Sequence, residues 1–212
     1  MNKQAFLRQW SELHGGAEVS GIVKGWLTIS YLLVRPLHAL KVSPNAITLI
    51  GLLLGVLTWE QAHHIAALFL VILSLIADGI DGSLAIISGK VTLWGAALDS
   101  VVDRVVEFFW ALTFYRIGAP VIVIALAWVA ALTQEYARAR AAGLGHRVLG
   151  VVTVCERPVR AIFLAVALLA YIMGFGIVTA TSWIWLALQL FSLVVVLRDS
   201  YTALSTDNRL SN

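Results

Sequence analysis

The sequence predicts an all-α integral membrane protein with about six transmembrane helices and an N-terminal interfacial amphipathic helix. Composition is the first reason: of 212 residues, 60% are hydrophobic and 13% are charged, and the mean hydropathy is +0.88. A soluble domain is about half apolar and a quarter charged, so this chain has too few polar residues to cover a soluble surface. Second, the apolar residues gather in runs of roughly 20, the length that crosses a bilayer as a helix. Third, most lysines and arginines lie between those runs.

Residues 1–42 are predicted to form a juxtamembrane amphipathic segment on the cytoplasmic side. The stretch 21–42 is apolar, but Lys24 and Arg35 interrupt it. These charges favour a helix that lies on the membrane over one that spans it. A seventh span is the alternative. The first residues lack a long apolar core followed by small residues, so no cleaved signal peptide is predicted.

Residues 43–205 are predicted to form the six-helix transmembrane domain, and 206–212 a cytoplasmic tail. The candidate spans lie near 45–62, 64–86, 93–115, 118–138, 158–178 and 181–203. Ser43 and Pro44 are typical of a helix start, because serine caps the first turn and proline fits its first position. No second domain is expected.

The positive residues predict the orientation of the spans. On one side of the predicted spans lie Lys3, Arg8, Lys24, Arg35, Lys41, Lys90, Arg138, Arg140, Arg147, Arg157, Arg160, Arg198 and Arg209. The opposite side offers Arg116 and little else. Because positive residues stay on the cytoplasmic side, both termini are expected there.

Two function classes are disfavoured by composition. The net charge is only +3, with no basic stripe carrying interleaved aromatic residues, so nucleic acid is not expected as a partner. The single cysteine, Cys155, excludes an internal disulfide.

Carboxylates are concentrated in one short part of the chain. The four aspartates are Asp78, Asp81, Asp99 and Asp103. Their spacings of three and four place each pair on one face of a helix. Gly89 is expected to end the first helix, so the two helices are antiparallel neighbours and the four carboxylates converge near the cytoplasmic face.

A divalent cation explains this concentration of negative charge. Bare carboxylates repel one another, and each buried ion costs several kcal/mol. Oxygen ligands suit Mg²⁺, Mn²⁺ or Ca²⁺ better than zinc, and four carboxylates are enough for two ions. Gly82 and Gly95 would let a bulky phosphate ligand approach. The pattern therefore favours a metal–phosphate site; an ion-translocation site and a purely structural role are the alternatives.

The segment 78–103 resembles the signature of the CDP-alcohol phosphotransferase family, D-x2-D-G-x2-A-R-x8-G-x3-D-x3-D. The matching residues are Asp78, Asp81, Gly82, Ala85, Gly95, Asp99 and Asp103. All spacings agree, and one position differs, because Ile86 stands where the family has arginine. The resemblance extends to six membrane helices with an N-terminal juxtamembrane helix.

The resemblance implies roles for these residues. Asp78, Asp81 and Asp99 would be ligands of a two-metal centre holding Mg²⁺ or Mn²⁺, with Asp103 a further ligand and the general base. The nucleotide-binding residues would be Asn45, Thr48, Gly82, Ala85 and Gly95. The reaction would transfer a phosphatidyl group from CDP-diacylglycerol to an alcohol and release CMP. Metal ions would neutralise the diphosphate, and a carboxylate would take the proton of the alcohol.

Ile86 cannot supply the charge of the family arginine. Lys90, four residues on, could reach the same region. A catalytically silent lipid- or nucleotide-binding paralogue therefore stays open, beside a cation or proton transporter.

Two arginine-containing motifs, YARARA and ERPVR, resemble those of actinobacterial phosphatidylinositol phosphate synthases within the family. The resemblance implies that Arg138, Arg157 and Arg198 bind the phosphate of the acceptor, for which planar guanidinium groups are suited. Inositol 1-phosphate is the preferred acceptor, and glycerol 3-phosphate, the substrate of phosphatidylglycerophosphate synthases, is the alternative. For Arg198, a snorkelling role at a helix end is equally open. The resemblance also implies a homodimer in a bacterial inner membrane, with a cytoplasmic active site.

Overall fold

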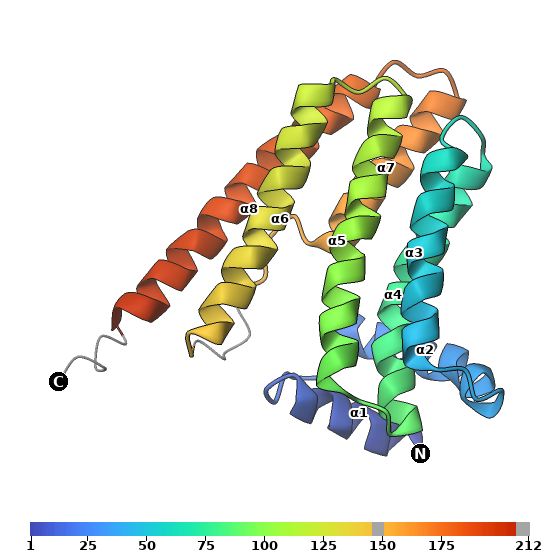
Figure 1. The fold of residues 1–212 in the computed structure, drawn as a ribbon, viewed down its shortest axis with the longest axis vertical. Coiled ribbons are helices and arrows are strands. Elements are labelled where there is room, and N and C mark those ends of the chain that lie inside the picture. Colours follow the sequence, from blue (N-terminus) through green and yellow to red (C-terminus); the bar gives the residue numbers. More distant parts are fainter. Residues whose placement is uncertain (146–150, 207–212) are drawn as a thin grey trace. The chain divides into compact units, whose positions relative to one another are not determined.

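The computed structural model describes residues 1–145 and 151–206, and in this part of the chain every regular element is a helix (Figure 1). The helices are α1 (Lys3–Leu13), α2 (Gly21–Ala39), α3 (Pro44–Glu60), α4 (Ala66–Ser88), α5 (Leu93–Arg116), α6 (Val121–Gly143), α7 (Arg157–Ile172) and α8 (Val178–Thr206). The all-α prediction is confirmed, and each of the six predicted apolar runs corresponds to one of the helices α3 to α8. Arg147, Arg209 and nearly all of the predicted tail lie outside the described residues.

The chain forms two compact units. The N-terminal unit contains residues 1–57 and 70–106. The C-terminal unit contains residues 58–69 and the described residues from Glu107 onward. Each unit carries one set of the predicted site residues: the aspartates belong to the first and the arginines to the second.

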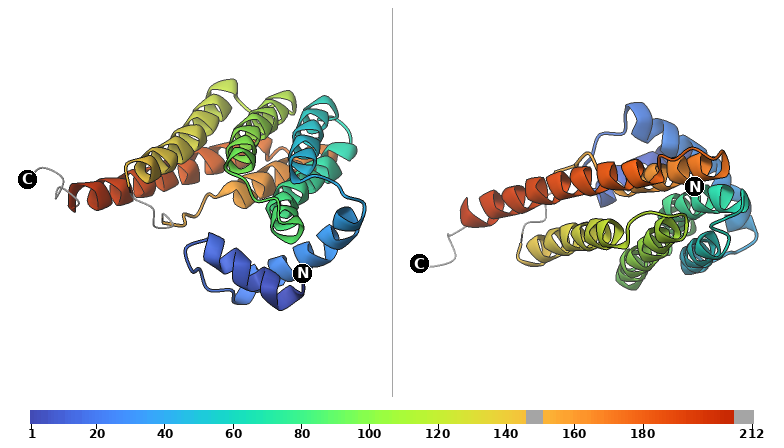
Figure 2. Two further views of the ribbon diagram at one scale, coloured as in Figure 1. Left: turned by 60° about the horizontal axis from the view of Figure 1, so that its bottom comes forward. Right: turned by 90° about the horizontal axis from the view of Figure 1, so that it is seen from above.

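Two helices occupy the N-terminal segment where one was predicted. Gly15 and Gly16 follow α1 with φ angles of +67° and +83°, a conformation that ends a helix. The helices α1 and α2 then pack on each other, as the left view of Figure 2 shows. The ring centroids of Phe6 and Tyr31 lie 5.5 Å apart, and the Tyr31 hydroxyl donates a hydrogen bond to the Met1 carbonyl.

An apolar core joins α1 and α2 to α3 and α4. Its buried members are Phe6, Leu27, Val34, Ile47, Ala77, Ile80, Leu84, Ile86 and Ile87. Gly79 of α4 is required for this packing, because a Cβ atom there would collide with the indole of Trp26 on α2. The core therefore holds the part of α4 that carries Asp78 and Asp81.

The helix ends near the site follow the predicted chemistry. Ser43 Oγ accepts a hydrogen bond of 3.2 Å from the Ala46 N–H, and α3 begins at Pro44. Gly89 has a φ angle of +65°, and the N–H groups of Gly89 and Lys90 donate to the carbonyls of Ile86 and Ala85. This pair of bonds is a Schellman motif, so Gly89 ends α4 as predicted.

In the C-terminal unit, α6 and α7 both pack on α8. The long helices α6 and α8 run side by side in Figures 1 and 2. Between them, the fully buried Gln189 donates a hydrogen bond of 2.8 Å from Nε2 to Oε1 of Gln134, also fully buried. Each amide therefore satisfies part of the hydrogen-bonding need of the other inside an apolar unit.

Within the described residues, α4, α6 and α8 have the length and apolar character of membrane spans. The pair α2 and α3, bent by 112° at its break, would make a fourth if it counted as one span. The other predicted spans fall short for physical reasons: α3 has 17 residues, α7 has 16, and α5 carries four charged residues between Asp99 and Glu107. The chain is thus a multi-pass membrane protein by its helices.

Candidate metal centre

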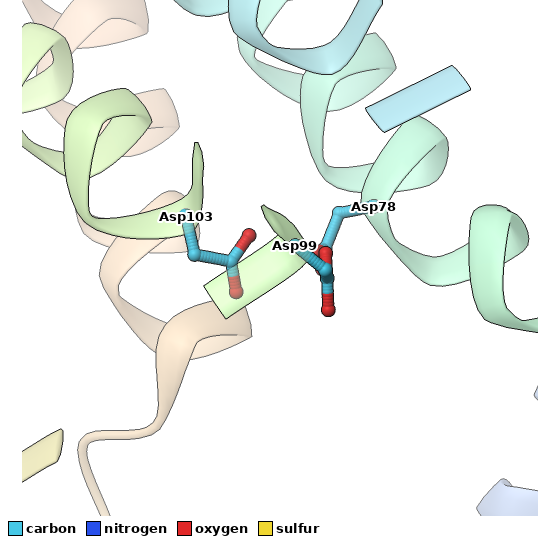
Figure 3. A group of neighbouring side chains, drawn as sticks. All are labelled: Asp78, Asp99 and Asp103. Carbon is cyan, nitrogen blue, oxygen red and sulfur yellow. The ribbon is translucent and has the colours of Figure 1, made fainter. Parts of the chain in front are cut away.

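Three aspartates of the N-terminal unit form one cluster. Asp78 comes from α4, and Asp99 and Asp103 come from α5; their carboxylates face one another in Figure 3. One carboxylate oxygen from each lies within 4.8 Å of the others, and all three side chains are half-buried. Arg104 lies 3.4 Å from Asp103 and offsets part of the negative charge. The donor set fits a hard divalent cation such as Mg²⁺ or Mn²⁺.

The structure does not bring Asp81 into this cluster. The residue is 5% exposed, and two short hydrogen bonds hold its carboxylate. Thr48 Oγ1 donates to Oδ2 at 2.6 Å, and the Gly82 N–H donates to Oδ1 at 2.6 Å. Spacing along α4 places Asp81 near Asp78, and the Thr48 hydroxyl of α3 holds one oxygen of its carboxylate beside the cluster.

Replacing Thr48 with valine is expected to lower the free energy of unfolding by about 2 kcal/mol, because it deprives a buried carboxylate of a charged hydrogen bond. Denaturant titration of the purified protein in detergent measures this. Thr48→Ser keeps the hydroxyl and should stay close to wild type. Equal stability of the valine and serine variants would contradict the assignment of this bond.

The remaining residues predicted to bind nucleotide lie on the same helices. A Cβ atom at Gly95 would come within 3.4 Å of the Asn45 amide oxygen and 3.0 Å of the Thr92 hydroxyl, so these residues are neighbours. A Cβ atom at Gly82 would meet no other atom within 4 Å. Ala85, one turn after Asp81 on α4, is half-buried. Small side chains thus line α4 and α5 beside the carboxylates.

Arg138 is deeply engaged with other protein groups in the C-terminal unit. Its Nη1 and Nη2 atoms donate to Oε2 and Oε1 of Glu156 at 2.9 and 2.6 Å. Nη2 also donates to the Val151 carbonyl at 2.8 Å, and Nη1 lies 3.3 Å from Glu135. Burial alone would raise the pKa of Glu156, but hydrogen bonds from Arg138 and Thr153 outweigh it and lower that pKa to about 2.

Arg160 is a site that sequence reasoning missed. Its side chain is 1% exposed and donates to Glu107 at 2.7 Å, to Glu135 at 3.1 Å and to the Cys155 carbonyl at 3.0 Å. The arginine therefore ties α5, α6 and the segment before α7 together. Glu107 and Glu135, which lie inside apolar helices, were the signal in the sequence, because a buried negative charge needs a positive partner.

The other two predicted arginines have different surroundings. The Arg157 guanidinium lies 5.3 Å from the ring centroid of Trp110, and the residue is 9% exposed. Arg198 lies on an exposed part of α8. The indole ring of Trp110 offers its negative face to the Arg157 cation.

Comparison with known proteins decides the family. Residues 41–197 match the CDP-alcohol phosphatidyltransferase family. The chain belongs to this family. The expected phosphotransferase fold and the resemblance of the aspartate segment are therefore confirmed, and the chain is an enzyme of this class by its family. The matched range includes the three clustered aspartates, Asp81 and Arg138.

Three relatives of this CDP-alcohol phosphatidyltransferase have named activities. It is 33% identical over 168 residues to the phosphatidylinositol phosphate synthase of Corynebacterium glutamicum, covering 74% of this chain and 73% of the relative. The archaetidylinositol phosphate synthase of Pyrococcus horikoshii is 30% identical, over 71% of this chain and 82% of the relative. The corresponding protein of Aeropyrum pernix is 38% identical, but the match spans only 47% of its length and 43% of this chain.

The fold of this chain is similar to that of solved structures. Mycobacterium tuberculosis phosphatidylinositol phosphate synthase with CDP-DAG bound superposes with a TM-score of 0.68 at 22% identity, covering 82% of this chain and 94% of the other. A second structure of that enzyme, in complex with manganese and citrate, gives a TM-score of 0.67. The TM-scores establish a shared fold, and at 22% identity the likeness shows the fold alone.

Ile86 marks where this family member departs from the family signature. The side chain is 3% exposed and lies in the core with Phe6, Leu27 and Val34. Lys90, which was expected to approach the same region, is exposed beyond the end of α4. The isoleucine is thus part of the packing of the N-terminal helices.

Replacing Ile86 with arginine is expected to lower the free energy of unfolding by about 3 kcal/mol, because the guanidinium would enter a closed apolar core. Denaturant titration in detergent measures the change. Ile86→Leu, which conserves volume, should cost less than about 1.5 kcal/mol. A stable arginine variant with tighter binding of CDP-diacylglycerol would show instead that the side chain reaches the donor.

Proposed function

We propose that this protein transfers a phosphatidyl group from CDP-diacylglycerol to a phosphorylated polar alcohol, with inositol 1-phosphate as the preferred acceptor and CMP as the product. The observation that carries the proposal is the cluster of Asp78, Asp99 and Asp103, whose carboxylate oxygens lie within 4.8 Å of one another. It lies inside the family match, and relatives named phosphatidylinositol phosphate synthase support the choice of acceptor.

Asp78, Asp99 and Asp103 would hold Mg²⁺ or Mn²⁺, with Asp81 completing the ligand set for a second ion. When bound, the metal supplies positive charge for the donor diphosphate and the departing CMP. Asp103 takes the proton from the acceptor hydroxyl. The hydroxyl oxygen then bonds to the phosphorus that carries the diacylglycerol, and the bond from that phosphorus to CMP breaks.

The nucleotide is assigned to the small and polar residues beside the carboxylates. These are Asn45, Thr48, Gly82, Ala85 and Gly95. Gly82 supports this assignment, because no atom lies within 4 Å of a Cβ built there. The acceptor phosphate is assigned to Arg138, Arg157 and Arg198, whose guanidinium groups suit its oxygens.

The membrane arrangement follows from the same assignment. Residues 43–205 form a six-span domain, with 1–42 at the interface and 206–212 in the cytoplasm. The 17-residue α3 is about 25 Å long, somewhat shorter than a typical hydrocarbon core. Local thinning or flanking polar residues accommodate such a helix at modest cost. Both termini and the site face the cytoplasm of a bacterial inner membrane, and the enzyme acts as a homodimer.

The test is CMP release by the purified protein in nanodiscs containing CDP-diacylglycerol, with Mg²⁺ or Mn²⁺. Inositol 1-phosphate, glycerol 3-phosphate, free inositol and serine are supplied separately. Release with inositol 1-phosphate and none with free inositol is expected, because the arginines recognise the phosphate. Release with glycerol 3-phosphate alone would move the protein to the phosphatidylglycerophosphate synthases. No release with any acceptor from folded protein would favour a silent paralogue.

A further inference from the structure

The carboxylate of Glu156 occupies the edge of Arg138 that an incoming anion would use. We propose that Glu156 is an exchangeable internal occupant of an anion site formed by Arg138 and Thr153, and that the acceptor phosphate binds by displacing it. This inference rests on the proposed function, since it concerns the arginine assigned to the acceptor.

Four donors surround the Glu156 carboxylate. Arg138 donates from Nη1 to Oε2 at 2.9 Å and from Nη2 to Oε1 at 2.6 Å. Thr153 donates to Oε1 from its N–H and from its hydroxyl, both at 2.7 Å. A two-pronged guanidinium contact is also the geometry in which arginine binds phosphate. The same four donors of Arg138 and Thr153 would therefore be able to bind a phosphate in place of the carboxylate.

Arg138 cannot offer the same edge to both anions. Besides Glu156, Nη2 donates to the Val151 carbonyl at 2.8 Å, and Nη1 lies 3.3 Å from Glu135. Each terminal nitrogen carries two hydrogens, so these four contacts engage the whole terminal edge of the guanidinium. A phosphate that binds there must replace Glu156.

The local charge favours exchange over addition. Hydrogen bonds connect two arginines, Arg138 and Arg160, with three glutamates, Glu107, Glu135 and Glu156. A phosphate added to this group would face an existing excess of carboxylate, and like charges at this range repel strongly where water is scarce. Removal of one carboxylate to solvent relieves that repulsion.

Glu156 has a route to solvent. Its side chain is 24% exposed, and it lies at the cap position directly before α7, outside the apolar helices. The side chain makes no capping hydrogen bond to α7, so its departure would leave the start of that helix intact. Thr153 and Arg138 would remain in place as donors.

The test measures binding of inorganic phosphate by calorimetry to the full-length protein in nanodiscs. Glu156→Gln keeps the shape of the side chain and removes its charge, so phosphate should bind about tenfold tighter than to wild type. Glu156→Asp, whose shorter side chain cannot span the Arg138 edge, should give an intermediate gain and provides a second variant if the glutamine protein does not fold. Glu60→Gln, an exposed carboxylate on another helix, should match wild type.

Phosphate binding that is unchanged or weaker in both Glu156 variants would overturn the exchange and make Glu156 a fixed partner that positions Arg138. Arg138→Gln should remove the gain when combined with Glu156→Gln. CMP release is measured separately on the same samples. If wild type releases CMP but the Glu156 variants show no gain in phosphate affinity, only the exchange is wrong. If the Glu156 variants gain phosphate affinity but wild type releases no CMP, only the proposed transferase activity is wrong.

Discussion

Replacing Asp103 with asparagine is expected to lower the rate of CMP release about a thousandfold. The neutral amide cannot accept the proton of the acceptor hydroxyl, a step that typically contributes a factor of this size. It also removes one of three charges from a cluster whose oxygens lie within 4.8 Å. The affinity for Mn²⁺, measured by titration calorimetry on the same protein, should therefore fall together with the rate.

The exposed Glu60 provides the matched control, because Glu60→Gln makes the same chemical change at a carboxylate that is not a member of the cluster. That variant should keep wild-type release and wild-type Mn²⁺ affinity. If Asp103→Asn released CMP at the wild-type rate, the assignment of base and ligand to this residue would be wrong. Loss of release with unchanged Mn²⁺ affinity would keep Asp103 as the base and remove it from the ligand set.

Replacing Arg160 with methionine is expected to lower the free energy of unfolding by about 3–5 kcal/mol. Glu107 is 3% exposed and receives a hydrogen bond of 2.7 Å from this guanidinium. The variant removes a positive charge that balances this buried carboxylate. Denaturant titration in detergent measures the difference, and Arg140→Met, which changes an exposed arginine of α6, should stay near wild type.

A double variant separates the ion pair from general damage to packing. Adding Glu107→Gln to Arg160→Met removes the buried negative charge, so the double variant should be more stable than the sum of the single effects predicts. Additive losses would show that Arg160 and Glu107 act independently, and would contradict the role of the pair in joining α5 to α7.

Local chemistry was sufficient to predict the helices α3 to α8, although it missed the division of the N-terminal segment into α1 and α2. The apolar runs near 64–86 and 93–115 became α4 and α5 within a few residues, because backbone hydrogen bonds and burial act along short stretches of chain. Ser43 and Gly89 marked helix ends for the same reason. The spacing between Asp99 and Asp103 likewise carried over directly into the cluster, because one turn of α5 places them together.

Tertiary structure decided what the charged groups do. Asp81 shares a helix with Asp78, yet its carboxylate accepts a hydrogen bond from the hydroxyl of Thr48 on α3, 33 residues away in sequence. Arg138 was predicted to bind the phosphate of the acceptor, and in the structure its guanidinium binds the Glu156 carboxylate. Arg160 reaches a glutamate 53 residues distant. Helix periodicity depends on neighbours along the chain, whereas a buried charge selects its partner from whichever helix packing brings within hydrogen-bonding distance, and no local pattern records that choice.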